Sequence, residues 1–270
     1  MRKLCSYFKI SRSAYYKTIR VRRKEDEEAH VVGELIQSTR KNLPRIGGKK
    51  VYKLISETLA QNEISIGRDR FMRIYREFGY QVVRKKNFVR TTMSYHRFHK
   101  HSNKIKELSI NRSHQVYVSD ITYLRTHQGF VYLFLITDAY SRKIVGWHLS
   151  KNLGMEGPLI SLQMALSQCP NPGELIHHSD RGIQYCNKEY TSLLEKYNTQ
   201  ISMTEENHCY ENALAERVNG ILKDEFLLGE TLPNYDLASR TVKESIHYYN
   251  SVRPHWSLNL LTPETVHAIS

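Results

Sequence analysis

Residues 115–150 read QVYVSDITYLRTHQGFVYLFLITDAYSRKIVGWHLS and contain three apolar runs separated by short polar turns. The runs are rich in Val, Ile, Tyr and Phe, which favour strands. Turn residues fall at Gln128-Gly129 and at Ser141-Arg142, and the short gaps predict an antiparallel meander of three strands. The second run is almost wholly apolar, which indicates a central strand covered on both faces.

Helix and strand patterns alternate after this meander. The predicted elements are a helix over 155–168, a strand in ELIHHSD, a helix near 187–197, a brief strand at QISM, and helices over 212–226 and 234–249. Three strands followed by alternating helices and strands are typical of a mixed α/β sheet.

The first 80 residues are helical by pattern, and they contain two candidate helix-turn-helix segments. One lies around KIS, where Ser11 would cap the second helix. A charged run at 20–30 is expected to act as a linker or as the start of a helix over 27–41. The other segment joins a helix over 49–61 to RDRFMRIYREFGY, which turns its apolar residues inward. Four arginines on the outer face favour contact with DNA phosphates or bases over a merely solvated face: Arg68, Arg70, Arg73 and Arg76.

Residues 81–113 are basic and lack clear periodicity. Arg84, Lys85 and Lys86 begin the run, and Glu107 is its single acid. Such a segment is typical of an extended connector that lies along a phosphate backbone, and equally of a flexible linker. The predicted organisation is therefore a helical DNA-binding region over 1–80, a basic linker over 81–113 and an α/β core with a C-terminal helical extension over 114–270.

The overall charge indicates a polyanionic partner. Lys and Arg number 40 against 27 acids in 270 residues, giving a net charge of +13. Nucleic acid is the simplest such partner, and the alternative is a basic protein that merely stays soluble. No apolar run approaches the roughly 18 residues that span a membrane, and no secretory signal is present. The four cysteines form no close pairs, as expected of reduced thiols in the cytoplasm.

Two aspartates are placed on rigid elements of the predicted sheet. Asp120 lies within the first strand, and Asp180 directly follows the strand in HHSDRG. Taken singly, each is more often a cap or an ion-pair partner than a catalytic group. Asp138, also at a strand end, is expected to order its turn, while His177 and His178 are expected to pack and hydrogen-bond locally.

A third acid is selected by helical phase in NALAERVNGILKDEF, residues 212–226. At 100° per residue, Leu214, Val218, Ile221 and Leu222 fall opposite Glu216. Glu216 shares a polar stripe with Asn212, Asn219 and Lys223, which leaves room for a substrate. The other two acids of the helix, Asp224 and Glu225, are expected to be ordinary charges, although Glu225 falls in the apolar arc, where it escapes to solvent or pairs.

Three carboxylates on separate elements of a basic protein predict a magnesium site at Asp120, Asp180 and Glu216. Hard divalent ions take oxygen ligands, and a pair of ions about 3.5–4 Å apart clamps the attacking and leaving oxygens of a phosphoryl displacement. Lys223 lies on the same helix face as Glu216, where it would hold a nearby phosphate. Arg181, in the turn after Asp180, would reach phosphate or pair with an acid.

This trio resembles the DDE triad of retroviral-integrase-like transposases, which use an RNase H-like fold. Thirty-five residues, 181–215, separate Asp180 from Glu216, as in the DD35E spacing. Lys223 follows the Glu by seven residues, where the family has Lys or Arg. The sequence segments around these residues are similar to those of the second-frame (OrfB) protein of IS3-family insertion sequences: VSDITYL, TDAYSRKIVGW, HHSDRGIQY, CYENALAERVNGILKDE and YYNSVRPHWSLNLLTP. The resemblance covers about residues 110–267 and is looser before them, where the family's helix-turn-helix segment is similar to residues 26–80.

The resemblance implies an RNase H-like mixed five-stranded sheet with flanking helices, preceded by an all-α helix-turn-helix region. It implies two Mg²⁺ ions, with Mn²⁺ as a substitute, that activate water to cut DNA at the 3′ end of an insertion element. The freed 3′-hydroxyl would then attack a phosphodiester directly. The implied partners are double-stranded DNA at the element ends and the target, at least one further copy of the chain, and the upstream-frame OrfA protein, alone or as a fusion. The implied setting is the bacterial cytoplasm, at the nucleoid.

Other readings remain open at this point. A non-catalytic DNA-binding regulator of transposition would use the same basic N-terminal half, and an RNase H-type nuclease would use the same acids. Arg253 and His255, in NSVRPH, fit DNA contact and fold stapling about equally.

Overall fold

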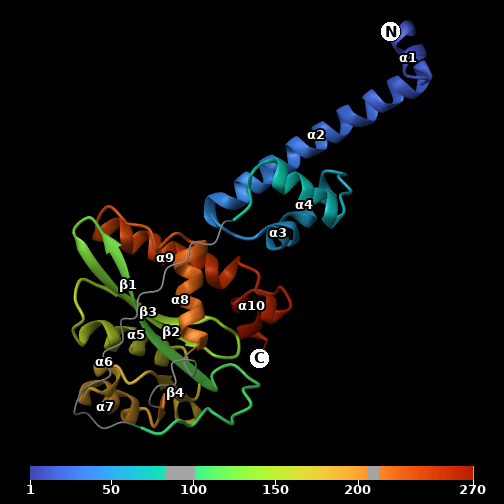
Figure 1. The fold of residues 1–270 in the computed structure, drawn as a ribbon. Helices are drawn as coiled ribbons and strands as arrows, with labels where there is room; N and C mark the ends of the chain where they lie inside the picture. The colour runs from blue at the N-terminus through green and yellow to red at the C-terminus, as the bar shows by residue number, and fades with distance from the viewer. Residues whose placement is uncertain (83–100, 206–212, 270) are drawn as a thin grey trace. The chain divides into compact units, whose positions relative to one another are not determined.

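The computed structural model describes residues 1–82, 101–205 and 213–269. The chain divides into two compact units, Met1–Val83 and Arg84–Ser270 (Figure 1). Within the described ranges, every helix is too short or too polar to cross a bilayer.

The first unit is built from four helices: α1 (Arg2–Tyr7), α2 (Arg12–Asn42), α3 (Gly48–Gln61) and α4 (Arg68–Glu77). Ser11 caps α2 as predicted, since its side chain accepts a hydrogen bond from the backbone N–H of Ala14. Neither expectation for the charged run, a linker or the start of a helix, is correct, because α2 continues through it as one helix of 31 residues. Lys, Arg and Glu are strong helix formers, and the pairs Arg23–Glu27 and Lys24–Glu28 lie at the i,i+4 spacing that supports a helix.

The second half of α2 packs with α3 and α4 around a small core. Val32, Ile36, Ile55 and Phe71 are among its buried side chains. Gly48 opens α3 against Tyr75 of α4, where an added Cβ would lie 3.1 Å from the Tyr75 ring. The predicted pair of helices joined by a turn is therefore present as α3 and α4. The second half of α2 buries their apolar faces.

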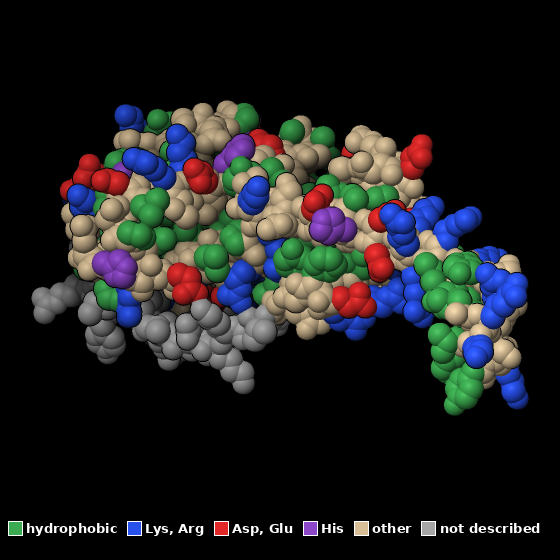
Figure 2. All heavy atoms as spheres, turned by 90° about the horizontal axis from the view of Figure 1, so that it is seen from above, with side chains coloured by type: hydrophobic (Ala, Val, Ile, Leu, Met, Phe, Trp, Pro, Cys, Tyr) green, Lys and Arg blue, Asp and Glu red, His purple; other side chains and the backbone are tan. Residues whose placement is uncertain are grey.

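The other half of α2, together with α1, carries exposed apolar side chains next to basic ones (Figure 2). Tyr7 is 81% exposed and Phe8 64% exposed, whereas Cys5 is buried. The basic side chains of this half of α2 are Arg12, Lys17, Arg20, Arg22, Arg23 and Lys24.

The second unit contains the five-stranded mixed sheet. Its strands are β1 (Val116–Thr126), β2 (Gly129–Asp138), β3 (Ile144–Ser150), β4 (Ile176–Ser179) and β5 (Gln200–Met203). Their order is β3-β2-β1-β4-β5. The first three strands form the predicted antiparallel meander, and β4 and β5 run parallel to β1 and to each other. This arrangement is the RNase H-like mixed sheet that was expected.

Helices cover both faces of this sheet (Figure 1). On one face, α5 (Glu156–Ser167), α6 (Ile183–Cys186) and α7 (Lys188–Lys196) enclose a core that contains Tyr117 and Leu162. On the other face, α8 (Ala213–Glu225) packs Ala215 against Val116 and Val118, and α9 (Tyr235–Ser251) lies beside β3.

The described end of the predicted basic linker packs against the second unit. Ile105, Leu108 and Ile110 contact the core beneath α8. Arg112 forms an ion pair with Glu174 at 2.8 Å. Residues 101–113 thus differ from the expected connector, because their apolar side chains are partly buried against the core, while residues 83–100 lie outside the described ranges.

Several short elements were not predicted: the four-residue helix α6, the six-residue helix α10 (Pro263–Ala268), and the 3-10 turns Pro172–Glu174 and Trp256–Leu258. Helices of one or two turns give too few residues for a periodic signal. Cys5, Cys169 and Cys186 are free thiols, as expected.

Candidate active site between β1 and the end of β4

Strand register brings Asp120 and Asp180 together. β1 and β4 pair in parallel with Ser119 opposite Ser179, so the next residue of each chain segment is an aspartate. Neighbouring strands lie about 4.8 Å apart, and residues opposite each other point to the same face. Two carboxylates from separate segments of the sequence therefore meet where β4 ends beside β1.

Burial and like charge act together on Asp120. Burial raises the pKa of Asp120 to about 7, and the charges of Asp180 and Glu216 contribute to the rise. Hydrogen bonds from Asn219 and from the backbone N–H of Ile121 oppose it. Such a site favours a proton or a cation that relieves the repulsion.

Asn219 connects α8 to this pair. Its side-chain Nδ2 donates a 2.6 Å hydrogen bond to Oδ2 of Asp120. Asn219 is only 6% exposed, and its Oδ1 is buried without a hydrogen-bond partner among the described residues. Helical phase placed Asn219 on the polar stripe expected to meet the substrate, whereas in the structure it turns inward, because Asp120 offers its amide a charged acceptor.

Glu216 lies one turn before Asn219 on α8 and is exposed. Its charge contributes to the raised pKa of Asp120, so the structure places it within electrostatic range of the aspartates. Even so, no three Asp, Glu, His or Cys side chains in the described ranges lie close enough to enclose a metal ion. Asp120, Asp180 and Glu216 therefore lie in one region, and Glu216 is the most exposed of the three.

Lys223 lies one further turn along α8 and faces the same region. Burial lowers the pKa of Lys223, while the charge of Asp120 raises it. Lys223 therefore lies near Asp120 as well as on the same helix face as Glu216. Its ammonium group would contact a phosphate bound at this place.

The turn after β4 fixes the Asp180 carboxylate. Its Oδ1 accepts a 2.9 Å hydrogen bond from the backbone N–H of Gly182. An added Cβ at Gly182 would lie 2.9 Å from the same oxygen, so the glycine lets the turn close on the carboxylate. Arg181, between them, is half-buried.

The histidines before Asp180 belong to the interior, as predicted. Nε2 of His177 lies 2.7 Å from Oγ of Ser119 and 2.9 Å from the hydroxyl of Tyr190. Burial lowers the pKa of His177 to about 3, so the ring is neutral at physiological pH. Nδ1 of His178 lies 2.9 Å from Oγ of Ser202.

Asp138 orders its turn, as expected. Its Oδ1 accepts hydrogen bonds from the backbone N–H groups of Tyr140 and Ser141. Ser141 Oγ lies 2.9 Å from Nδ1 of His267, which ties the turn to α10. No sequence pattern indicated this contact, because His267 lies 126 residues away on an unpredicted helix.

The surroundings of Arg253 favour fold stapling over DNA contact. It is 3% exposed, and its guanidinium donates to both carboxylate oxygens of Glu225 at 2.7 and 2.6 Å. Its Nη1 lies 2.9 Å from Nε2 of His255. These contacts fit fold stapling, and Glu225, within the apolar arc of α8, is the residue that pairs with Arg253.

The other predicted DNA contacts differ in their surroundings. Arg70 forms a 2.9 Å ion pair with Glu28 of α2 and is largely covered, which favours a structural role. Arg73 is exposed beside Glu77. Asn212, Arg84, Lys85 and Lys86 lie outside the described residues.

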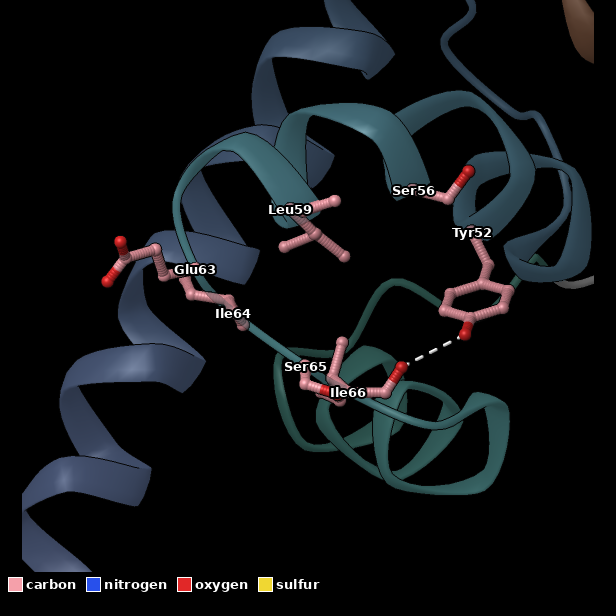
Figure 3. Close-up of a pocket in the computed structure, with 8 residues that line it drawn as sticks. Tyr52, Ser56, Leu59, Glu63, Ile64, Ser65 and Ile66 are labelled. Atoms are coloured by element: carbon pink, nitrogen blue, oxygen red, sulfur yellow. Dashed lines mark hydrogen bonds between the residues drawn. The ribbon is translucent and has the colours of Figure 1, made fainter.

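A shallow pocket lies on the first unit between α3 and the segment that leads to α4 (Figure 3). The hydroxyl of Tyr52 donates a 2.9 Å hydrogen bond to the carbonyl oxygen of Ile66 across it. Glu63, its one acid, points away from the other labelled side chains (Figure 3). None of the predicted site residues lines this pocket.

Two protein families match the second unit. Residues 110–209 match the integrase core domain family, and residues 195–263 match a second integrase core domain family. The two matches together contain Asp120, Asp180 and Glu216.

Relatives of the chain occur among insertion elements. The chain is 32% identical over 273 aligned positions to an uncharacterised 31 kDa protein of insertion element IS600 from Shigella sonnei, covering 96% of each chain. It is 37% identical over 151 positions to transposase InsF of insertion sequence IS3A from Escherichia coli, covering 56% of this chain and 52% of InsF.

Solved structures of retroviral integrases are also similar. The catalytic core domain of HTLV-2 integrase in complex with magnesium aligns with a TM-score of 0.46 and 18% identity, covering 58% of this chain and 97% of that one. A simian T-cell lymphotropic virus intasome chain aligns with a TM-score of 0.44 and 14% identity, covering 59% and 57%.

Proposed function

Because the chain belongs to the IS3 family of insertion-sequence transposases and contains an integrase catalytic core, we propose that it cleaves DNA at the 3′ ends of an insertion element and joins those ends to new strands. The observation that carries the proposal is the pairing of β1 with β4. This pairing sets Asp120 beside Asp180, with Asn219 and Lys223 of α8 directed at the same place.

The side chains fit a divalent metal in their chemistry. The donors at the site are oxygens, which Mg²⁺ and Mn²⁺ prefer. Burial raises the pKa of Asp120, and the charges of Asp180 and Glu216 add to the rise, while the buried Oδ1 of Asn219 lacks a partner in the described part of the chain. A cation would relieve both conditions. Asp120, Asp180 and Glu216 would hold it, and bound metal would supply Lewis-acid stabilisation of the phosphodiester oxygens.

The chain's own groups would position the substrate. Lys223 would hold a phosphate next to the scissile one, and Arg181 would approach the strand from the turn after β4. The hydrogen bond from Asn219 would favour the ionised form of Asp120 and hold its carboxylate in the site. No serine or tyrosine nucleophile is required, because water and then the freed 3′-hydroxyl attack phosphorus directly.

The first unit would bind DNA. The turn between α3 and α4 and the exposed Arg73 fit a helix-turn-helix that contacts phosphates, and Arg84, Lys85 and Lys86 would extend the basic path. Joining two element ends requires at least two copies of the chain on DNA. The upstream-frame OrfA protein is the proposed additional partner.

The test is a strand-transfer assay with labelled DNA from the ends of the element that encodes the chain. Purified protein is incubated with Mg²⁺ or Mn²⁺, alone and with the OrfA protein. We expect 3′-end cleavage and joined products that disappear in Glu216→Gln and persist in Asp224→Asn, a matched change of an exposed acid on the same helix. DNA binding without a metal-dependent product in both settings would indicate a regulator instead. Cleavage of the RNA strand of a hybrid would indicate a nuclease.

A further inference from the structure

An aromatic group projects from the hairpin formed by β1 and β2. Tyr123 and Tyr132 face each other across the strands, with ring centroids 5.1 Å apart at 73°. The ring of Phe130 lies 6.5 Å from that of Tyr123 at 82°. Arg125, opposite Phe130 in the register, places its guanidinium carbon 5.4 Å from the Phe130 ring. These four residues form the hairpin cluster.

The cluster lies where helical cover of the sheet ends. Phe130, Tyr132 and Phe134 alternate onto one face of β2. Gly157, in the first turn of α5, is so close to the Phe134 ring that an added Cβ would lie 2.4 Å from it, and Phe134 is buried. Tyr132 is only half-buried and Phe130 is 52% exposed. The aromatic row on β2 therefore extends past the first turn of α5, so that Phe134 is covered by the helix while Tyr132 and Phe130 are not fully covered.

The cluster is close to the paired aspartates. Tyr123 follows Asp120 by three residues, a span of about 10 Å along a strand. β4 ends at Ser179 while β1 continues to Thr126, so Asp180 lies where the two strands part. Asp120 and Tyr123 point to opposite faces, and Asp180 is within electrostatic range of both: burial and the charge of Tyr132 raise the pKa of Tyr123, and the charge of Asp180 adds to the rise.

We propose that the hairpin cluster binds unpaired DNA bases next to the scissile phosphate, with Phe130 as the main stacking surface and Arg125 as the partner of the adjoining phosphate. The inference rests on the proposed strand-transfer function and extends it by assigning the contact made by a frayed or single-stranded DNA end. Exposed aromatic rings beside a cation are the combination that binds single-stranded nucleic acid, because every base presents a π-face.

Charge favours DNA over a protein occupant. The chain carries a net charge of +13, and the exposed charge within the cluster is the cation Arg125. Single-stranded DNA fits both features, because its bases would stack on the aromatic rings and its phosphates would pair with the guanidinium of Arg125. Arg125 and Phe130 lie five residues along β1 from Asp120, about 17 Å and on the opposite face, so a strand of a few nucleotides would reach them by passing the end of β4.

The test measures binding separately from catalysis. Fluorescence anisotropy without divalent metal compares a blunt duplex of the element end with the same duplex bearing a short single-stranded tail that contains 2-aminopurine. We expect Phe130→Ala to weaken binding of the tailed duplex by about 5- to 100-fold and to abolish quenching of the 2-aminopurine, with the blunt duplex unchanged. Phe130→Leu, which keeps apolar bulk, should show most of the same loss, and Phe130→Tyr should retain binding. Tyr197→Ala, at an exposed aromatic residue of the C-cap of α7, is the matched control.

Equal loss for both DNAs, or no loss for the tailed duplex, would overturn the proposal. So would a defect in self-association, measured by analytical ultracentrifugation, that leaves binding of the tail intact, because it would assign the cluster to a second copy of the chain. Failure of the strand-transfer function has a different signature, since it would remove metal-dependent products from the wild-type chain without changing the tail-specific binding.

Discussion

The side-chain amide of Asn219 donates a 2.6 Å hydrogen bond to the carboxylate of Asp120, which joins helix α8 to the central strand β1. This bond lowers the pKa of Asp120 against the effects of burial and of two nearby acids, which raise it. Asn219 therefore acts on the proposed metal site through Asp120, as a positioning residue.

Asn219→Ala should weaken metal-dependent activity by about 10- to 100-fold, the usual effect of losing a hydrogen bond behind a metal ligand. Without the donor, the pKa of Asp120 should rise above its present value of about 7, so the pH at half-maximal activity should also rise. The pH profile of strand transfer and the ¹³C shift of the Asp120 carboxyl give the two readouts. Gly220→Ala is the control, since nothing lies within 4 Å of a Cβ there. A loss of activity with an unchanged pH profile would contradict this role.

Asp120→Asn should stabilise the metal-free protein above pH 7. The folded-state pKa of Asp120 is about 7 against an ordinary 3.8, so between these values the folded chain holds a proton that the unfolded chain has released. The free energy of unfolding of the wild-type chain should therefore fall as pH rises through this window, by at most about 4 kcal/mol. The amide variant lacks this loss.

Thermal melts from pH 4 to pH 8 without divalent metal measure the difference. The stability gap should widen up to about pH 7, the pKa of Asp120, and stay constant above it. Asp180→Asn should reduce the same pH dependence, because the charge of Asp180 contributes to the raised pKa. Parallel melting curves for Asp120→Asn and the wild-type chain at every pH would show that Asp120 is not strained in this way.

The strands and the acids were readable from sequence because their signals are local. The meander was indicated by alternation and turn residues, and Asp138 was assigned to its turn because it ends a strand. Helical phase also placed Glu216 on the exposed side of α8.

The contacts of Asn219 and Arg253 could not be predicted from local sequence patterns. Phase analysis treats every polar side chain as solvent-facing, yet Asn219 is buried because its partner is a carboxylate 99 residues away. Arg253 had two equal readings until the fold brought Glu225 to it. The long-range pairing that decides such residues is a property of the tertiary structure, and no spacing in the sequence encodes it.

Gly146→Ala should separate α5 from β3. An added Cβ would lie 2.2 Å from the carbonyl oxygen of Ser161 and 2.9 Å from the Cβ of Ala165, and neither neighbour is a flexible side chain. We expect a loss of about 1–3 kcal/mol in the free energy of unfolding, measured by urea denaturation. Gly220→Ala, in an open helical position, should instead be neutral or stabilising. Equal stability of Gly146→Ala and the wild-type chain would show that the helix shifts at no cost.

The buried pair of Arg253 and Glu225 should contribute to stability and leave DNA affinity unchanged. Arg253→Ala leaves the Glu225 carboxylate without its bidentate partner and should cost about 3–5 kcal/mol. Arg253→Lys should also destabilise, because an ammonium group cannot match both oxygens. The double variant Arg253→Met with Glu225→Met should recover much of the loss, since no unpaired charge remains. Urea denaturation gives the energies, and anisotropy with element-end DNA, at temperatures where each variant is folded, gives the affinities. If Arg253→Ala retained full stability and lost DNA affinity, the arginine would be a DNA contact after all.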